Sequence, residues 1–140
     1  MAACIRRSGA ELFRAIAAAV ERAQGPAQVL AAGVAGFFSF IESHGQGWFM
    51  LIGESAVVGE AAAALEVIRR DEAAFVAQRL AIEFPDARAR DLEAFAQAII
   101  GACERLALWR RDRPGVTVAD ATGSLTSLLW GGLVALADAG

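Results

Sequence analysis

The sequence contains no lysine, a single histidine and only two cysteines, and each shortage excludes some chemistry. Cys4 and Cys103 stand far apart, so they make neither the disulfide framework of a small secreted protein nor a zinc knuckle. Other metal-ligand spacings, such as Glu-x-x-His or Cys-x-x-Cys, are also missing. We therefore expect no metal, no cofactor and a reducing, cytoplasmic location.

The only histidine, His44, offers little for catalysis. It stands beside Gly45 at the expected end of a helix, where the helix dipole favours a polar or cationic side chain. A serine or cysteine nucleophile would need a base, and His44 has no evident partner. The sequence also lacks a glycine-rich loop that would hold nucleotide phosphates. We expect no catalytic residues, and the chain is predicted not to be an enzyme.

The charge balance is slightly acidic. All 13 basic side chains are arginines, against 16 acidic ones, which leaves a net charge of −3 at pH 7. Such a chain has no general attraction for the phosphate backbone of nucleic acids. We therefore expect no direct nucleic-acid binding by this chain.

Two long uncharged stretches raise the question of a membrane. Residues 23–41 contain glutamine, glycine and proline, and residues 121–137 contain threonines and serines. Neither stretch supplies the roughly 20 predominantly apolar residues of a spanning helix. The first seven residues carry two arginines without a following apolar segment, so they do not form a signal peptide. We expect a soluble protein with no membrane partner.

Apolar residues recur at helical spacing along nearly the whole chain, whereas strand alternation and hairpin turns are missing. A chain of 140 residues is long enough for one buried core. The fold class is therefore all-α, with about six antiparallel helices. The helices that we expect run from Ser8 to Gly25, from Pro26 to Ser43, over residues 47–54, over residues 60–83, from Asp86 to about Arg113, and over residues 118–137.

Two of these helix starts have recognisable signals. Pro85 breaks one helix, and Asp86 is expected to cap the next. The Thr117-x-x-Asp120 pattern resembles a capping box with the shorter acid.

The last two helices are apolar on more than one side. The final helix has no charge between Asp120 and Asp138, and Gly123, Gly131 and Gly132 suit the close approach of another helix. A symmetric partner is the commonest cover for such surfaces in a soluble protein. The dimer interface that we expect consists of Ile99, Cys103, Leu106, Leu125, Leu128, Leu129, Gly132, Leu133 and Leu136.

Aromatic residues are concentrated between positions 37 and 49. As a group they exceed what a small helical core requires, and large aromatics also line apolar ligand pockets. A densely packed core without a ligand is the alternative. The pocket that we expect, suited to a small, neutral and largely apolar ligand, is bounded by Phe37, Phe40, Ile41, Trp48, Ile52, Phe75 and Gln97.

Four segments resemble tetracycline-repressor-like (TetR-like) transcriptional regulators. Residues 8–16, SGAELFRAI, are similar to the start of the family's fourth helix. Residues 37–44, FFSFIESH, with the following Trp-Phe pair, are similar to its fifth helix. Residues 94–112, which end LALWRRD, look like the eighth helix, and residues 125–133, LTSLLWGGL, look like the ninth.

This resemblance implies a homodimer in which the last two helices form a four-helix bundle with their symmetry mates. It also implies an effector pocket within the preceding helices. Only seven residues precede the fourth-helix segment, where the family has a three-helix DNA-reading head. We therefore interpret residues 1–7 as an N-terminal remnant or start. Residues 8–140 are then the C-terminal effector-binding and dimerisation domain, and DNA binding belongs to a helix-turn-helix head in the parent protein.

Two other functions stay open from the sequence. The chain could be a headless structural protein that dimerises and forms inactive heterodimers. It could also be an enzyme that uses the apolar cavity. Ligand binding separates the sensing module from the structural protein, and only saturable turnover would indicate an enzyme.

Overall fold

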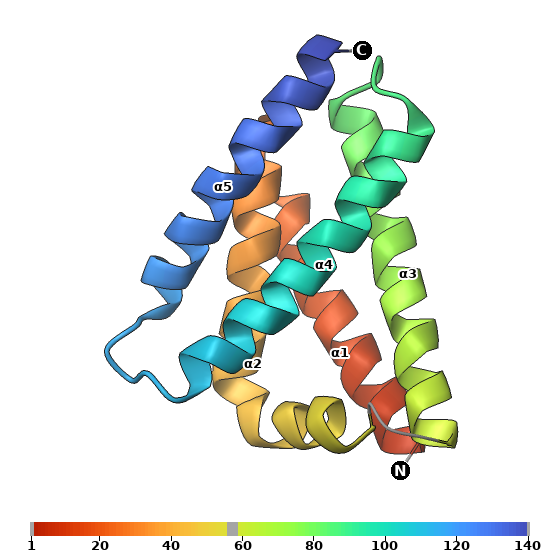
Figure 1. Ribbon diagram of the computed structural model, residues 1–140, viewed down its shortest axis with the longest axis vertical. Helices are drawn as coiled ribbons and strands as arrows, with labels where there is room; N and C mark the ends of the chain where they lie inside the picture. Colours follow the sequence, from red (N-terminus) through yellow and green to blue (C-terminus); the bar gives the residue numbers. More distant parts are fainter. Residues whose placement is uncertain (1, 56–58, 140) are drawn as a thin grey trace.

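The computed structural model describes the backbone of residues 2–55 and 59–139, and the side chains of residues 3–49, 59–136 and 138. Over these residues the chain forms helices and no strand, which confirms the all-α fold class. There are five helices in the described ranges rather than about six (Figure 1). They are α1 (Ala2–Glu21), α2 (Gly25–Ser55), α3 (Glu60–Glu83), α4 (Ala89–Arg111) and α5 (Val118–Ala139).

The difference in number arises at His44, where the sequence predicts a helix end. The chain bends there instead, with φ −124° and ψ 15° at His44, and continues as the second half of α2 (Figure 1). Gly45 and Ser43 flank the bend, and glycine and serine are common at helix kinks. The His44 ring donates a hydrogen bond from Nδ1 to the Phe40 carbonyl, at 3.1 Å, and so satisfies an acceptor that the bend disturbs.

The helix starts follow the sequence signals in one case and depart from them in another. Thr117 and Asp120 form the expected reciprocal capping box, with each backbone N–H 3.0 Å from the other's side-chain oxygen. The predicted cap at Asp86 is wrong, because α4 begins at Ala89 with Arg88 in the capping position. Asp86 lies instead in the turn that follows Pro85.

The helix α2 is the centre of the fold and packs against each of the other four helices. Phe38, which is fully buried, lies in the main core together with Leu12 of α1 and Leu133 of α5. A close approach of α1 to α2 depends on Gly36, because a Cβ there would lie 3.2 Å from the Ala19 Cβ. The two helices therefore pack as a tight pair.

A second, smaller core joins α1 to α3. It consists of Ile5, Ala64 and Leu65, with Ile5 only 1% exposed. Residues 2–7 are thus the first turns of α1, and Ile5 within them takes part in packing.

One helix is long and apolar enough to cross a membrane by length and composition. This stretch of α2, Gly25–Phe49, has a mean hydropathy of 1.2 in its apolar window. The same stretch contributes Val34, Phe38 and Ile41 to the main core. A core helix of a soluble protein passes the same test, so this feature does not indicate a membrane protein.

Candidate functional site

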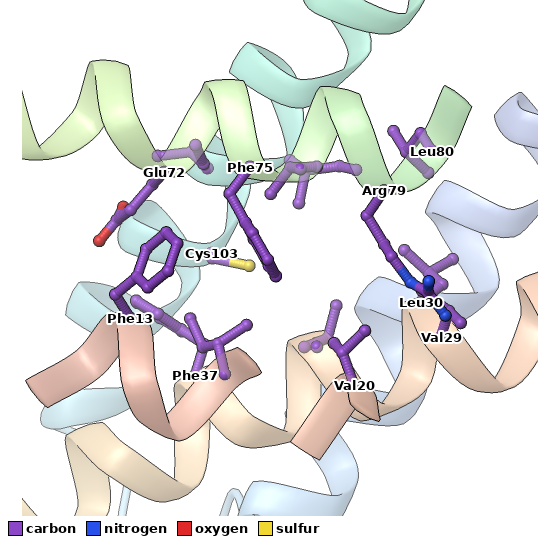
Figure 2. A pocket seen from close by; sticks show the side chains of 16 residues that line it. Phe13, Val20, Val29, Leu30, Phe37, Glu72, Phe75, Arg79, Leu80 and Cys103 are labelled. Carbon is purple, nitrogen blue, oxygen red and sulfur yellow. The ribbon is translucent and has the colours of Figure 1, made fainter. Parts of the chain in front are cut away.

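A partly open cavity of about 90 Å³ lies between α1, α2, α3 and α4 (Figure 2). Of its 16 lining residues, 13 are apolar or glycine. The other three are Glu72, Arg79 and Cys103. An engineered apolar cavity of about 150 Å³ holds a benzene molecule, so this space suits a small ligand after modest side-chain movement. Concave, mostly apolar sites with a few polar groups are typical of ligand-binding pockets.

Helical spacing builds the apolar walls. On α1, Phe13, Ile16 and Val20 are three and four residues apart and therefore share one face. The walls from α2 and α4 are likewise apolar, apart from the Cys103 thiol. Across the cavity, the rings of Phe13 and Phe75 meet edge to face with centroids 4.8 Å apart. This aromatic pair closes one side of the cavity.

Glu72 places a carboxyl group in these apolar surroundings. The residue is only 9% exposed, and its Oε1 atom has no hydrogen-bond partner among the described residues. Burial raises the pKa of Glu72 to about 8, the negative charges of Glu104 and Asp71 add to the rise, and Arg69 opposes it. Near neutral pH the carboxyl is therefore largely protonated in the ligand-free domain.

Arg69, the nearest cation to Glu72, is already occupied. Its guanidinium donates two hydrogen bonds to Glu104 of α4, both at 2.9 Å. The hydrogen bond with Glu104 is the main reason that the pKa of Arg69 is raised. This two-point ion pair ties α3 to α4 and leaves the Glu72 carboxyl without a cation of its own.

Arg79 lies on the same face of α3 as Glu72, at the opposite end of the cavity (Figure 2). Their spacing of seven positions in the sequence corresponds to about 10 Å along the helix. The Arg79 Nη2 atom is 3.2 Å from Glu83, while its buried Nε has no partner in the described part of the chain. The cavity thus has an acidic and a basic end.

Cys103 lies between these ends and is 6% exposed. Burial raises the pKa of its thiol to about 12, and the charges of Glu72 and Glu104 contribute. The thiol therefore stays protonated at physiological pH and lacks the thiolate character of a reactive cysteine.

The structure brings only part of the predicted pocket to this cavity. Phe37 and Phe75 line it. Phe40, Ile41 and Trp48 are buried in the main core, outside the cavity lining, with the Phe40 ring stacked on His44 and perpendicular to Trp48. Gln97 is exposed on α4, and the side chain of Ile52 lies outside the described residues. Ligand contact by this set stays a prediction.

The sequence pattern contained a signal for Glu72 and Arg79, although neither was predicted as a site residue. Leu65, Ile68 and Phe75 lie on the apolar stripe of α3, whose positions follow one another at alternating steps of three and four residues. Glu72 and Arg79 occupy positions of the same stripe, which a solvated charge would avoid. A charged residue at a core-facing position of a helix is unusual, and it indicates that the side chain borders a cavity or a functional site.

Most of the predicted dimer residues are covered by the chain's own core. Ile99, Cys103, Leu125, Leu129 and Leu133 are buried there, and Leu106, Gly132 and Leu136 are partly buried. Among the nine, only Leu128 is strongly exposed, at 72%.

The glycines of α5 behave differently from one another. A Cβ at Gly132 would lie 3.0 Å from the Phe95 ring of α4, so this glycine permits a close contact within the chain. At Gly123 and Gly131 a Cβ would meet no atom within 4 Å in the described residues. These two glycines therefore lie on an open face of α5.

Four of the five helices, α1 to α4, surround the mostly apolar cavity of this helical domain. The family model of the tetracyclin repressor-like C-terminal domain matches residues 26–132, which is more than half of the chain. The chain belongs to this family, and the resemblance seen in the sequence is confirmed. Domains of this family are parts of transcriptional regulators rather than enzymes. No curated protein matches the chain at a significant level.

Proposed function

We propose that this chain is the effector-sensing and dimerisation domain of a TetR-like regulator. In this proposal a small, mostly apolar molecule binds in the cavity and controls DNA binding by a helix-turn-helix head of the parent protein, in the cytoplasm. The observation that carries the proposal is the cavity itself, which four helices of a tetracyclin repressor-like domain surround. Its walls are apolar apart from three side chains, as expected for such a ligand.

The cavity position suggests how binding would act on the rest of the protein. It lies between the α1–α2 pair, packed closely at Gly36, and the α3–α4 pair, joined by Arg69 and Glu104. A ligand that fits one separation of these pairs better than another shifts the domain toward that separation. Movement of α1 would then reach a head attached at its N-terminal end.

Dimerisation is the second part of the proposal, and its support is the exposed faces of α4 and α5. On α5, Gly123, Ser127, Leu128 and Gly131 recur at helical spacing and are exposed. On α4, Ala94, Ala98 and Gly101 form an exposed strip of small residues at helical spacing, and Trp109 is exposed near the end of the helix. Small side chains and isolated large apolar ones on neighbouring helices suit a helix-packed symmetric interface.

Ligand binding can be tested with one neutral probe, benzyl alcohol, and one pair of variants. Val76→Phe adds a ring to a cavity wall, whereas Val67→Phe makes the same change at a position on α3 that is 49% exposed. We expect calorimetry to detect binding by the wild type and by Val67→Phe, and none by Val76→Phe. Equal binding by both variants would place the site elsewhere. A wild type that dimerises without binding would favour the purely structural alternative.

A further inference from the structure

Glu72 is the one acidic residue in the lining of the cavity, and its Oε1 atom lacks a hydrogen-bond partner among the described residues. Burying a polar group without a partner is unfavourable, so a molecule that donates a hydrogen bond to Glu72 gains more than one that only fills space. In Figure 2 the carboxyl lies beside Phe13, at the left end of the cavity.

The surrounding charges favour a cationic donor over a neutral one. On α3, Arg69 and Asp71 act on Glu72, and on α4 Glu104 does so. The cavity residues of α1 and α2 carry no charge. Arg69 is bound through two hydrogen bonds to Glu104, so an ionised Glu72 has no cation of its own in this cluster.

We propose that the cavity selects small apolar molecules that carry a single cationic nitrogen, and that Glu72 binds this nitrogen as a carboxylate. The proposal rests on the proposed function, because it names the chemical class of the effector. The apolar body of such a ligand would lie against the Phe13–Phe75 ring pair and Val34. Its charged end would complete the ion pair that Glu72 lacks.

The cavity is small, so a ligand of one ring with a short substituent would enter only if lining side chains moved or part of the ligand extended through the open side. A volume of about 90 Å³ is smaller than the cavity of about 150 Å³ that accepts benzene in another protein. Benzylamine, benzyl alcohol and benzoate share a ring and differ in charge, so they form a matched set of probes. Benzoate also tests whether Arg79, at the other end, recruits an anion instead.

Affinities of the three probes are measured by calorimetry at pH 8 on the wild type, Glu72→Gln and Glu66→Gln. Glu66 is an exposed acid on the same helix and serves as the matched control. We expect benzylamine to bind the wild type and Glu66→Gln about tenfold or more tightly than benzyl alcohol, since charge-assisted hydrogen bonds are the stronger kind. Glu72→Gln should lose this preference and keep its affinity for benzyl alcohol.

The pH dependence gives a second readout. Because the pKa of Glu72 is about 8, only about one carboxyl in a hundred is ionised at pH 6 and about half at pH 8. Benzylamine affinity should therefore rise about fiftyfold between pH 6 and pH 8 in the wild type, and should stay nearly flat in Glu72→Gln. Benzyl alcohol should show no such rise in either protein.

The outcomes separate the two proposals. If benzyl alcohol binds as tightly as benzylamine, or benzoate binds more tightly than both, the cationic-ligand proposal is overturned while the sensing function stands. If a benzylamine preference survives in Glu72→Gln, Glu72 is not the partner and the proposal also fails. If none of the three probes binds the wild type, both proposals fail together.

Discussion

At the scale of single residues, Glu72 has the most unusual surroundings in the described part of the chain. Its side chain is 9% exposed in the lining of a mostly apolar cavity, and Arg69, the cation that lowers its pKa, is bound to another acid. Replacing such a group with a neutral residue of the same shape can stabilise a protein, because a buried charge without a partner raises the free energy of the folded state.

A consequence for stability follows from the raised pKa of Glu72. In the unfolded chain the carboxyl has an ordinary pKa near 4.5, and in the folded domain about 8. Its contribution to the free energy of unfolding is therefore intact below pH 4.5 and is lost progressively as the pH rises toward 8. We expect Glu72→Gln to be more stable than the wild type by about 2–4 kcal/mol at pH 8 and nearly equal to it at pH 4.

Urea titrations of both proteins at several pH values would test this expectation. Glu66→Gln, at an exposed site, should follow the wild type throughout. A difference between Glu72→Gln and the wild type that does not change with pH would show that Glu72 ionises normally in the folded domain.

At the scale of helices, the sequence predicts the pattern well and the details less well. The range Glu60–Glu83 was predicted as observed, because Gly59 and Pro85 punctuate the chain on either side. The bend at His44 was predicted as a helix end, since sequence signals for a kink and for a stop are the same small residues. The predicted start of α4 was three residues too early, at Asp86 instead of Ala89. A residue type that favours the capping position does not by itself determine where the first helical turn begins.

The pocket was less predictable than the helices. Phe37 and Phe40 both belong to the apolar side of α2, but only the relative rotation of the helices decides which of them reaches the cavity. That rotation depends on contacts such as Gly36 against Ala19, which join residues of different helices. Local periodicity therefore identifies core candidates without separating the packed ones from those beside a void.

Two phenylalanine variants test the distinction between residues packed in the core and residues beside the cavity. Phe40 is 6% exposed and surrounded by core, so Phe40→Ala should lower the free energy of unfolding by about 3–5 kcal/mol. Phe75 already borders a void and is only partly buried, so Phe75→Ala should lower it by clearly less. Chemical denaturation of both variants measures the difference. Equal losses would indicate that the space beside Phe75 is filled in solution.

At the scale of the whole molecule, the proposed dimer depends on which face of α5 is left free by the chain's own core. The family relationship and the exposed small-residue face of α5 support a dimer, whereas most residues first expected at its interface serve the chain's own core. The reason is that α5 packs on α2, which turns its apolar stripe inward and its glycine-bearing side outward. A sequence with apolar character on two sides does not show which side faces which neighbour.

Leu128→Arg tests the proposed interface directly. The side chain is 72% exposed, so the substitution should leave the fold intact, while a charge in a helix-packed interface is strongly unfavourable. Ile82→Arg is the matched control, because Ile82 is 66% exposed on α3 and lies outside the proposed interface. We expect sedimentation at micromolar concentration to give dimers for the wild type and Ile82→Arg, and monomers for Leu128→Arg. A monomeric wild type would refute the dimer.

The void between the helix pairs has a mechanical consequence. Unfolding removes internal empty space, so hydrostatic pressure favours the unfolded state in proportion to the void that is lost. A space of about 90 Å³ per molecule corresponds to roughly 50 mL/mol, which lies within the range of volume changes seen for protein unfolding. An occupant would make the domain harder to compress. The ligand-free protein should therefore unfold at distinctly lower pressure than the occupied one, even where their melting temperatures differ little.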